Sequence, residues 1–300
     1  MIDPKLYTLL AVVEYKSYTQ AAQHLSLTQP AVTQHIKQLE KELNVKIFNR
    51  VGRETKPTNQ GNIVIQYARR SIALYKRMQQ NILDAQRHKR SLTVGVTHTA
   101  ESNAVAEVLA KYSAKNPGTS ITIITDTIKN LYNMLKSYEV DLAVVEGKID
   151  DDSINSILLD TDSLMLVVSN NHPLAKKSMV TINELKKQPL ILRRPSSGTM
   201  NLFISHLESH NISLDDFNVI LEVDNIATIK ALIRRDIGVS ILAKSACMDE
   251  VKKGKITVLP IENLSMTREI NILYPNDFKH MDILQNIVKE YNKTVKLYSS

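Results

Sequence analysis

Apolar and polar residues follow the period of a helix between positions 19 and 43. In the second half of this segment, apolar residues recur at steps of four, three and four, so they share one helical face. These residues are Val32, Ile36, Leu39 and Leu43. Ala21, Ala22 and Leu25 give the preceding residues a small apolar face that permits close approach. The pattern predicts two short helices joined by a tight turn.

The opposite side of the second predicted helix is polar and carries no acidic residue between Thr28 and Gln38. We expect Thr28 to cap this helix, and a proline in the first turn is tolerated because its missing N–H would have no partner there. Amide side chains can pair with adenine, and lysine can reach guanine or a phosphate. The candidate DNA-contacting residues of this helix are Thr28, Gln29, Pro30, Thr33, Gln34 and Lys37. An ordinary packed helix pair has the same periodicity, so the pattern alone leaves DNA binding open.

Basic residues are concentrated around and after the helix pair. Arg50, Arg53 and Lys56 surround a glycine turn, as in a wing that holds the phosphate backbone of DNA. Residues 1–90 carry 15 Lys and Arg against 6 Asp and Glu, a balance of +9, whereas the whole chain carries +7. Residues 91–300 therefore sum to −2. This segregation of charge is typical of a nucleic-acid-binding domain.

The first 60 residues resemble the winged helix-turn-helix of the LysR-type transcriptional regulators. The matching segments are 6–10, 17–22, 27–33, 36–40 and 48–50. The length of the chain and the order of its segments also fit, so the resemblance covers the whole chain. Members often carry Ser-Arg where this chain has Thr33-Gln34, and Gly where it has Lys16. The resemblance therefore predicts how the helix docks but not which bases it reads.

The resemblance implies three regions: a winged helix-turn-helix at 1–58, a linker and dimerisation helix with a hinge at 59–90, and an effector-binding domain at 91–300. In this family the last region resembles a type 2 periplasmic-binding-protein fold, in which two α/β subdomains hold a small effector between them. Carried onto this chain, subdomain I comprises 91–161 and 268–300, and subdomain II comprises 162–267. The resemblance also implies a dimer, paired into a tetramer, that binds an interrupted dyad in promoter DNA.

Residues 59–88 predict one long helix with a heptad seam. Apolar or small residues alternate steps of four and three without a break, the pattern of a two-helix coiled coil. The seam residues are Val64, Ala68, Ser71, Tyr75, Met78, Ile82 and Ala85. A core-facing stripe would look similar, but Ile63, Ile72 and Leu74 lie off the seam and indicate more than one packing partner. We interpret the segment as a dimerisation helix, because a two-fold dimer reads two half-sites about one helical turn apart.

From residue 91 onward, short β-rich runs alternate with helical segments. Continuous apolar runs such as Leu-Ala-Val-Val and Met-Leu-Val-Val are typical of central strands covered on both faces. We therefore expect a mostly parallel α/β sheet. The predicted strands are 92–96, 120–125, 141–146, 164–169, 190–192, 219–223, 238–242 and 269–274.

Hydroxyl-rich segments follow three of these strands, at 97–99, 196–199 and 224–228. Each leads into a predicted helix, the first opening at Glu101, so its side chains could simply be N-caps. Hydroxyls and free N–H groups at helix starts also form an anion-binding niche. Members of the family commonly hold a carboxylate or sulfate at these places. The resemblance assigns this role to Thr97, Thr99, Ser196, Ser197, Gly198, Thr199 and Thr228, and we add the neighbouring His98.

Glu146 is a further candidate for the effector site, because it ends a predicted strand at the mouth of this niche. An acid beside an anion niche would repel a simple dianion. It would favour an amino acid or another zwitterion, or it would pair with an internal Lys or Arg.

Other kinds of chemistry have no motif in support. The sequence contains no GxGxxG or GxxxxGK[ST], no Cys/His cluster with metal spacing and no nucleophile elbow, so we expect no cofactor and no metal. No apolar run approaches the ~20 residues of a membrane span, and the N-terminus lacks the pattern of a signal peptide. The single Cys247 suits a reducing cytoplasm, and we interpret it as a buried small residue.

The sequence thus predicts a cytoplasmic, sequence-specific DNA-binding transcriptional regulator. A small anionic or zwitterionic metabolite between the two α/β subdomains would modulate its activity, and RNA polymerase is a further expected partner. The alternative is an enzyme or a small-molecule-binding protein with an appended helix-turn-helix. Activator and repressor are equally compatible with the sequence, which names neither the effector nor the promoter.

Overall fold

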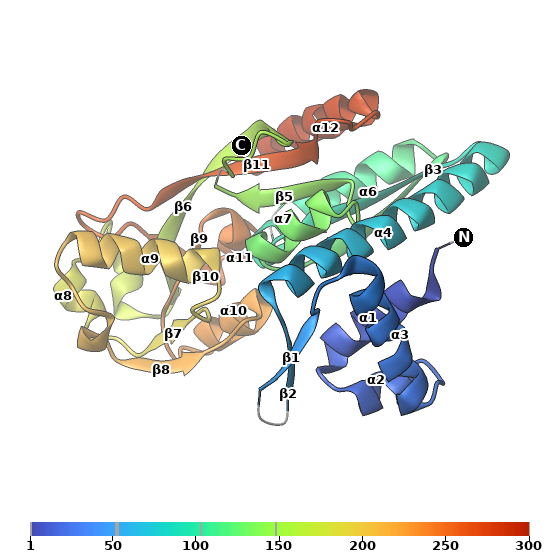
Figure 1. Cartoon of the computed structure of the whole chain (residues 1–300). Coiled ribbons are helices and arrows are strands. Elements are labelled where there is room, and N and C mark those ends of the chain that lie inside the picture. The colour runs from blue at the N-terminus through green and yellow to red at the C-terminus, as the bar shows by residue number, and fades with distance from the viewer. Residues whose placement is uncertain (1, 52–53, 103, 148, 300) are drawn as a thin grey trace. The chain divides into compact units, whose positions relative to one another are not determined.

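The chain forms two compact units (Figure 1). We term Met1–Arg90 with Lys136–Glu139 the N-terminal unit, and Ser91–Leu135 with Val140–Ser300 the C-terminal unit. The computed structural model describes residues 2–51, 54–102, 104–147 and 149–299. No helix in these ranges is long and apolar enough to cross a membrane.

Short capped helices and one hairpin make up the N-terminal unit. Its elements are α1 (Pro4–Tyr15), α2 (Tyr18–His24), α3 (Gln29–Leu43), β1 (Phe48–Val51), β2 (Glu54–Pro57) and α4 (Asn59–Arg87). Side chains cap the four helices at Asp3, Ser17, Thr28 and Thr58. The predicted helix pair and its cap are confirmed, because the Thr28 hydroxyl accepts a hydrogen bond from the Ala31 N–H at 3.3 Å. The two strands pair antiparallel and form the predicted wing.

The apolar face of α3 lies in the core of this unit. Val32, Ile36 and Leu39 are buried together with Leu9 and Ala21 of the two preceding helices. Leu43, which the periodicity places on the same face, is 49 % exposed. It is the last residue of α3, and the next residue, Asn44, turns the chain with a φ of 52°.

The long helix α4 buries one face and exposes an apolar stripe. Gly61, Ile65, Ala68 and Ile72 are buried. The exposed large apolar residues of α4 are Ile63, Tyr67, Leu74, Met78, Ile82 and Leu83. At the start of the predicted seam, Val64 and Ala68 contribute to the core of their own unit. Two residues, Met78 and Ile82, belong both to the predicted seam and to the exposed stripe, and both lie in the second half of α4.

The C-terminal unit is built on a seven-stranded sheet in the order β10-β6-β11-β5-β3-β4, with β9 also paired to β6. Its strands are β3 (Arg90–Val96), β4 (Thr119–Thr125), β5 (Leu142–Glu146), β6 (Ile154–Ser169), β9 (Ser240–Ala243), β10 (Ile256–Leu259) and β11 (Thr267–Pro275). A separate parallel pair is formed by β7 (Leu190–Leu192) and β8 (Val219–Glu222). The helices are α5 (His98–Glu101), α6 (Val105–Lys115), α7 (Ile128–Lys136), α8 (Ile182–Leu185), α9 (Gly198–Ser209), α10 (Ile226–Arg234), α11 (Met248–Lys252) and α12 (Met281–Ser299).

The α/β class is confirmed, but the expectation of a mostly parallel sheet is wrong. The parallel pairs β3–β5 and β7–β8 stand beside antiparallel pairs of β11 with β5 and β6, and of β6 with β9 and β10. The cause is the 16-residue strand β6, which runs antiparallel to β11 and belongs to both halves of the unit. In its first eight residues only Ile154 is buried, so this half lacks the continuous apolar run from which 164–169 was predicted. The sequence interpretation also missed β10.

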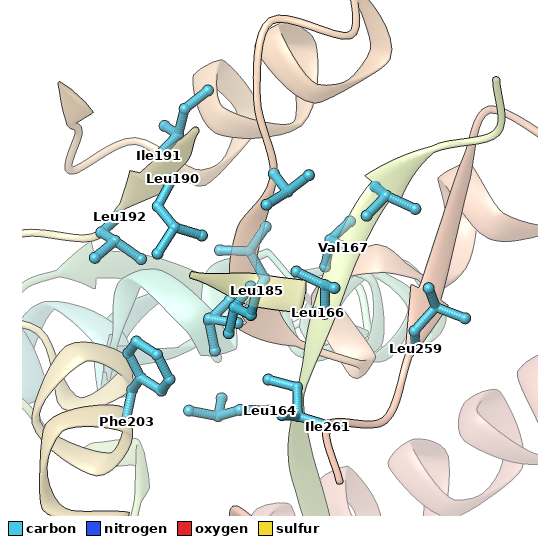
Figure 2. Close-up of a cluster of buried hydrophobic side chains, with 14 of the residues drawn as sticks. Leu164, Leu166, Val167, Leu185, Leu190, Ile191, Leu192, Phe203, Leu259 and Ile261 are labelled. Atoms are coloured by element: carbon cyan, nitrogen blue, oxygen red, sulfur yellow. The ribbon is translucent and has the colours of Figure 1, made fainter. Parts of the chain in front are cut away.

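Two halves of the C-terminal unit have separate cores. The buried cluster of one half runs from Leu164 to Met266 and includes Leu166, Leu190 and Phe203. Figure 2 shows side chains of β6, β7 and α9 meeting in this core. The other half buries two clusters, one around Leu92 and Leu284 and the other around Leu131 and Leu273. We call the half with Leu131 the first subdomain and the half with Leu190 the second.

Candidate functional sites

The polar face of α3 lies beside the wing. Thr28, Gln29, Pro30, Gln34 and Lys37 are exposed, and Thr33 is half-buried. The Gln29 amide donates a hydrogen bond to the Thr33 hydroxyl at 2.9 Å, and this hydroxyl donates to the Gln29 carbonyl at 3.0 Å. The pair orients one amide on the surface of the helix. Of these residues, Gln29, Thr33 and Lys37 line one surface together with residues of the wing, whereas Thr28, Pro30 and Gln34 do not.

A concave surface of about 550 Å³ lies between α3 and the wing. It is lined by Gln29, Thr33 and Lys37, and also by polar residues that sequence reasoning missed, namely Ser17, Thr19, Asn49 and Thr55. Hydroxyl and amide groups of this kind commonly contact DNA phosphates. The sequence could have pointed to these four residues, because they are polar and lie at the start of α2 or in the hairpin of the wing.

One carboxylate fixes the wing to α3. Oε1 of Glu40 accepts the backbone N–H of Ile47 at 2.8 Å and that of Phe48 at 3.4 Å. The backbone of Arg50 lies in β1 opposite Thr55, and Lys56 is exposed on β2 opposite Asn49. Arg53, the third predicted phosphate contact, lies outside the described residues.

A cavity of about 580 Å³ lies between the two subdomains of the C-terminal unit. Most of the predicted effector residues line it: Thr97, His98, Thr99, Glu146, Ser196, Ser197 and Gly198. Thr199 and Thr228 do not. Thr199 is buried in the first turn of α9, and Thr228 is exposed on α10, where its N–H donates to the Asn225 cap at 3.0 Å.

Hydroxyl groups at the cavity serve as helix caps, as the alternative interpretation required. The Thr97 hydroxyl accepts the Ala100 N–H at 3.1 Å, so α5 begins at His98 and not at the predicted Glu101. The same hydroxyl donates to Oε1 of Glu146 at 2.7 Å. The Ser197 hydroxyl accepts the Met200 N–H at 3.1 Å and starts the 12-residue helix α9. The start of α9 therefore faces the cavity with its positive end.

Sequence reasoning missed the most unusual residue of the cavity, Arg193. Its side chain is 3 % exposed and lines the cavity, and its Nη2 donates to Oδ1 of Asp224 at 3.3 Å. Among the described residues, Nε and Nη1 of this guanidinium have no hydrogen-bond partner. Desolvation lowers the pKa of Arg193, while attraction to Asp224 and Glu146 opposes that shift. The available signal was two arginines directly after a predicted strand and before a hydroxyl-rich segment.

A second buried guanidinium lies close by. Nε, Nη1 and Nη2 of Arg268 on β11 are buried and lack hydrogen-bond partners among the described residues. A Cβ atom placed on Gly198 would lie 3.8 Å from Nη1 of Arg268, so this cation sits at the start of α9. The described residues contain no group of three or more His, Cys, Asp or Glu that could hold a metal ion.

Comparison with known families accounts for both units. Residues 4–62 match the family model "Bacterial regulatory helix-turn-helix protein, lysR family", and residues 85–290 match the "LysR substrate binding domain". The chain belongs to the LysR family. It is a transcriptional regulator with a helix-turn-helix DNA-binding domain and an effector-binding domain.

Individual relatives agree with this assignment. A probable RuBisCO transcriptional regulator of Phaeodactylum tricornutum is 29 % identical over 274 residues, which cover 90 % of this chain and 89 % of the relative. The HTH-type transcriptional regulator CysL of Bacillus subtilis is 26 % identical and covers the same shares of the two chains. The crystal structure of full-length CbnR complexed with its target DNA has a similar fold, with a TM-score of 0.66, 19 % identity and coverage of 98 % of this chain and 100 % of that chain.

Proposed function

We propose that the protein regulates a promoter by inserting α3 into the major groove of an A/T-biased half-site. The observation that carries this proposal is the exposed polar face of α3 next to an antiparallel wing. Gln29, Thr33 and Lys37 would contact base edges, with Thr28, Pro30 and Gln34 beside them. Arg50, Arg53 and Lys56 would hold phosphates. DNA binding would place the protein in the cytoplasm, and RNA polymerase is its proposed partner at the promoter.

The exposed stripe of α4 supports a dimer as the DNA-reading form. Met78 and Ile82 are about half exposed and belong both to the stripe and to the predicted heptad seam. Burying such side chains against a second copy is favourable by about 25 cal/mol for each Å² of apolar surface. Ser71 and Tyr75 continue the seam toward the DNA-binding core. Two dimers would pair into a tetramer and read an interrupted dyad.

The cavity between the subdomains is the proposed effector site. A small anionic or zwitterionic metabolite would bind there and close the subdomains. Closure changes the placement of the dimers and the bending of the promoter, and the ligand drives this only through its different affinities for the two arrangements. The protein would act by binding rather than by catalysis, in keeping with relatives that are transcriptional regulators. Activation and repression are both compatible with this mechanism.

Selection of duplexes from a random library by the full-length protein tests the DNA-binding proposal. We expect an enriched dyad, and Gln29→Ala should bind the enriched duplex about tenfold more weakly, because a base contact is worth about 1–3 kcal/mol. Gln79→Ala, an exposed glutamine of α4, is the matched control and should bind normally. Enrichment of no sequence would contradict the proposal.

Sedimentation of the full chain tests the dimer. Met78→Asp places a charge in the stripe and should shift the dimer toward monomer. Asn62→Asp introduces the same charge at an exposed position of α4 that has no stripe residue three or four positions away, and it should sediment as the wild type does. Equal behaviour of the two variants would exclude this face of α4 from the interface.

A further inference from the structure

Arg193 has hydrogen-bonding capacity that the protein leaves unused. The side chain is 3 % exposed, and Nε and Nη1 have no partner among the described residues, while Nη2 is held by Asp224 at 3.3 Å. A guanidinium cannot lose its proton in a protein, so it cannot escape the cost of burial by becoming neutral. Each buried donor without an acceptor costs free energy that a bound acceptor would recover. Because Arg193 lines the cavity, that acceptor can come from a ligand.

Positive charge is concentrated on the same side of the cavity. The start of α9 lies there with Ser196, Ser197 and Gly198 in the lining, and first-turn N–H groups have no partner within a helix. Arg268 adds its charge next to Gly198, and its three guanidinium nitrogens are buried without hydrogen-bond partners among the described residues. An oxyanion at this place would meet the guanidinium of Arg193 and one helix end, and Arg268, which lies outside the lining, would add its charge from beside Gly198.

The remainder of the lining carries acids and one lysine, Lys129. Glu146 is 7 % exposed and accepts one hydrogen bond from Thr97, and Asp126 also lines the cavity, whereas Asp224 is the partner of Arg193. A ligand that carried only negative charge would be repelled by these carboxylates. A hydroxyl or ammonium group would instead donate to them.

We propose that the effector is a compact molecule with an oxyanion at one end, bound by Arg193 and the start of α9, and a hydroxyl or ammonium donor at the other, bound by Glu146. This inference rests on the proposed effector site and defines its ligand class. Carboxylate and phosphate share the anchoring chemistry, and hydroxyl and ammonium share the donating chemistry. Arg193 anchors the ligand, and Glu146 selects it.

Four small probes separate these requirements. Acetate, glycolate and glycine carry the same carboxylate. Acetate has no further donor, glycolate adds a hydroxyl and glycine adds an ammonium group. Inorganic phosphate tests the alternative anion. Binding to the full-length protein is followed by thermal unfolding and by ligand-observed NMR up to about 0.1 M at constant ionic strength. We expect glycolate, glycine or both to bind at least about threefold more tightly than acetate, since each adds one hydrogen bond.

Paired variants assign the contacts. Arg193→Gln should raise the dissociation constant of every bound probe about tenfold, the usual effect of losing a charged hydrogen bond. Arg194→Gln removes the same charge from the neighbouring side chain, which is 63 % exposed and 4.0 Å from Asp224, and this exposed pair should change the dissociation constant by less than about twofold. Glu146→Gln should strengthen acetate binding and reduce the preference for the probe with a donor, because the amide oxygen still accepts a hydrogen bond but the negative charge is gone. Arg193→Lys keeps the charge but loses the planar set of guanidinium donors, so it should also bind the probes more weakly. It replaces Arg193→Gln in the test if that variant does not fold.

Three results would overturn the inference: no binding of any probe by the wild type, equal effects of Arg193→Gln and Arg194→Gln, or acetate binding as tightly as both donor-bearing probes. Selected DNA is assayed with the same variants. Retained DNA binding together with one of these results would refute the ligand class and leave the regulator intact. Absence of DNA binding with the expected probe results would instead refute the proposed function.

Discussion

The Thr97 hydroxyl donates a hydrogen bond to Oε1 of Glu146 at 2.7 Å and accepts the backbone N–H of Ala100 at 3.1 Å. The buried side chain of Thr97 thus lies directly after β3, caps α5 and forms a hydrogen bond with Glu146, the last residue of β5. Because both Thr97 and Glu146 are buried and line the cavity, stability and ligand recognition depend on the same bond.

Replacing Thr97 by valine should destabilise the C-terminal unit. The substitution keeps the shape and leaves a buried carboxylate without that donor, at a cost of about 1–3 kcal/mol, with about 1 kcal/mol more for the lost cap. Hydrogen exchange of the β3 and β5 amides in the full chain measures the change. Thr97→Ser keeps the hydroxyl and should lose much less stability. Equal losses of stability in the two variants would show that the hydrogen bond to Glu146 contributes little.

Gly61→Ala should destabilise the N-terminal unit, although alanine normally stabilises a helix by about 1 kcal/mol relative to glycine. A Cβ atom on Gly61 would lie 2.1 Å from the carbonyl oxygen of Ile47, a backbone atom that also accepts the Thr58 N–H at 2.9 Å. Overpacking of this kind costs about 1–3 kcal/mol. Hydrogen exchange of the amides of α1–α3 shows whether the N-terminal unit is stabilised or destabilised. Asn62→Ala, at an exposed position, is the control. A stabilised Gly61→Ala would contradict the close approach of α4 to Ile47.

Lys56→Ala should weaken binding to the selected duplex and to random duplexes by the same factor. A phosphate contact carries no base information, and losing one should reduce the slope of log K against log salt by about 0.9. Fluorescence anisotropy at several salt concentrations measures both the loss of affinity and the slope with salt. Lys111→Ala removes a lysine of α6 that pairs with Glu107 at 2.6 Å in the C-terminal unit and should change neither. A larger loss on the selected duplex would assign Lys56 to base reading.

The buried thiol of Cys247 should resist modification in the native protein. Burial raises its pKa from 9.0 to about 12, so the reactive thiolate is scarce until the protein unfolds. A thiol that ionises more readily when unfolded lowers stability as the pH rises from 9 toward 12. Denaturant unfolding should therefore show the stability of the wild type approaching that of Cys247→Ala over this range, and thiol titration should require denaturant. Rapid modification of the folded protein at pH 8 would contradict the burial.

Local patterns predicted the N-terminal unit well because its elements follow from short-range rules. The period of Val32, Ile36 and Leu39 fixes the buried face of α3, and the hydroxyl of Thr28 fixes where this helix starts. The same rules predicted one long helix from residue 59. They could not tell which face of α4 its own core would use, so Val64 and Ala68 were assigned to a partner although they pack inside their own unit.

By itself the sequence determined the two helices of the DNA reader, the segregation of basic charge, the α/β class and the hydroxyl-rich helix starts, because each depends on neighbours along the chain. Only the tertiary structure decided that β6 runs antiparallel to β11, since that pairing joins residues more than a hundred positions apart. It also decided that Arg193 lies buried in the lining of the same cavity as Glu146, with two nitrogens lacking partners among the described residues. Burial and missing acceptors are properties of packed space, and no pattern along the chain records them.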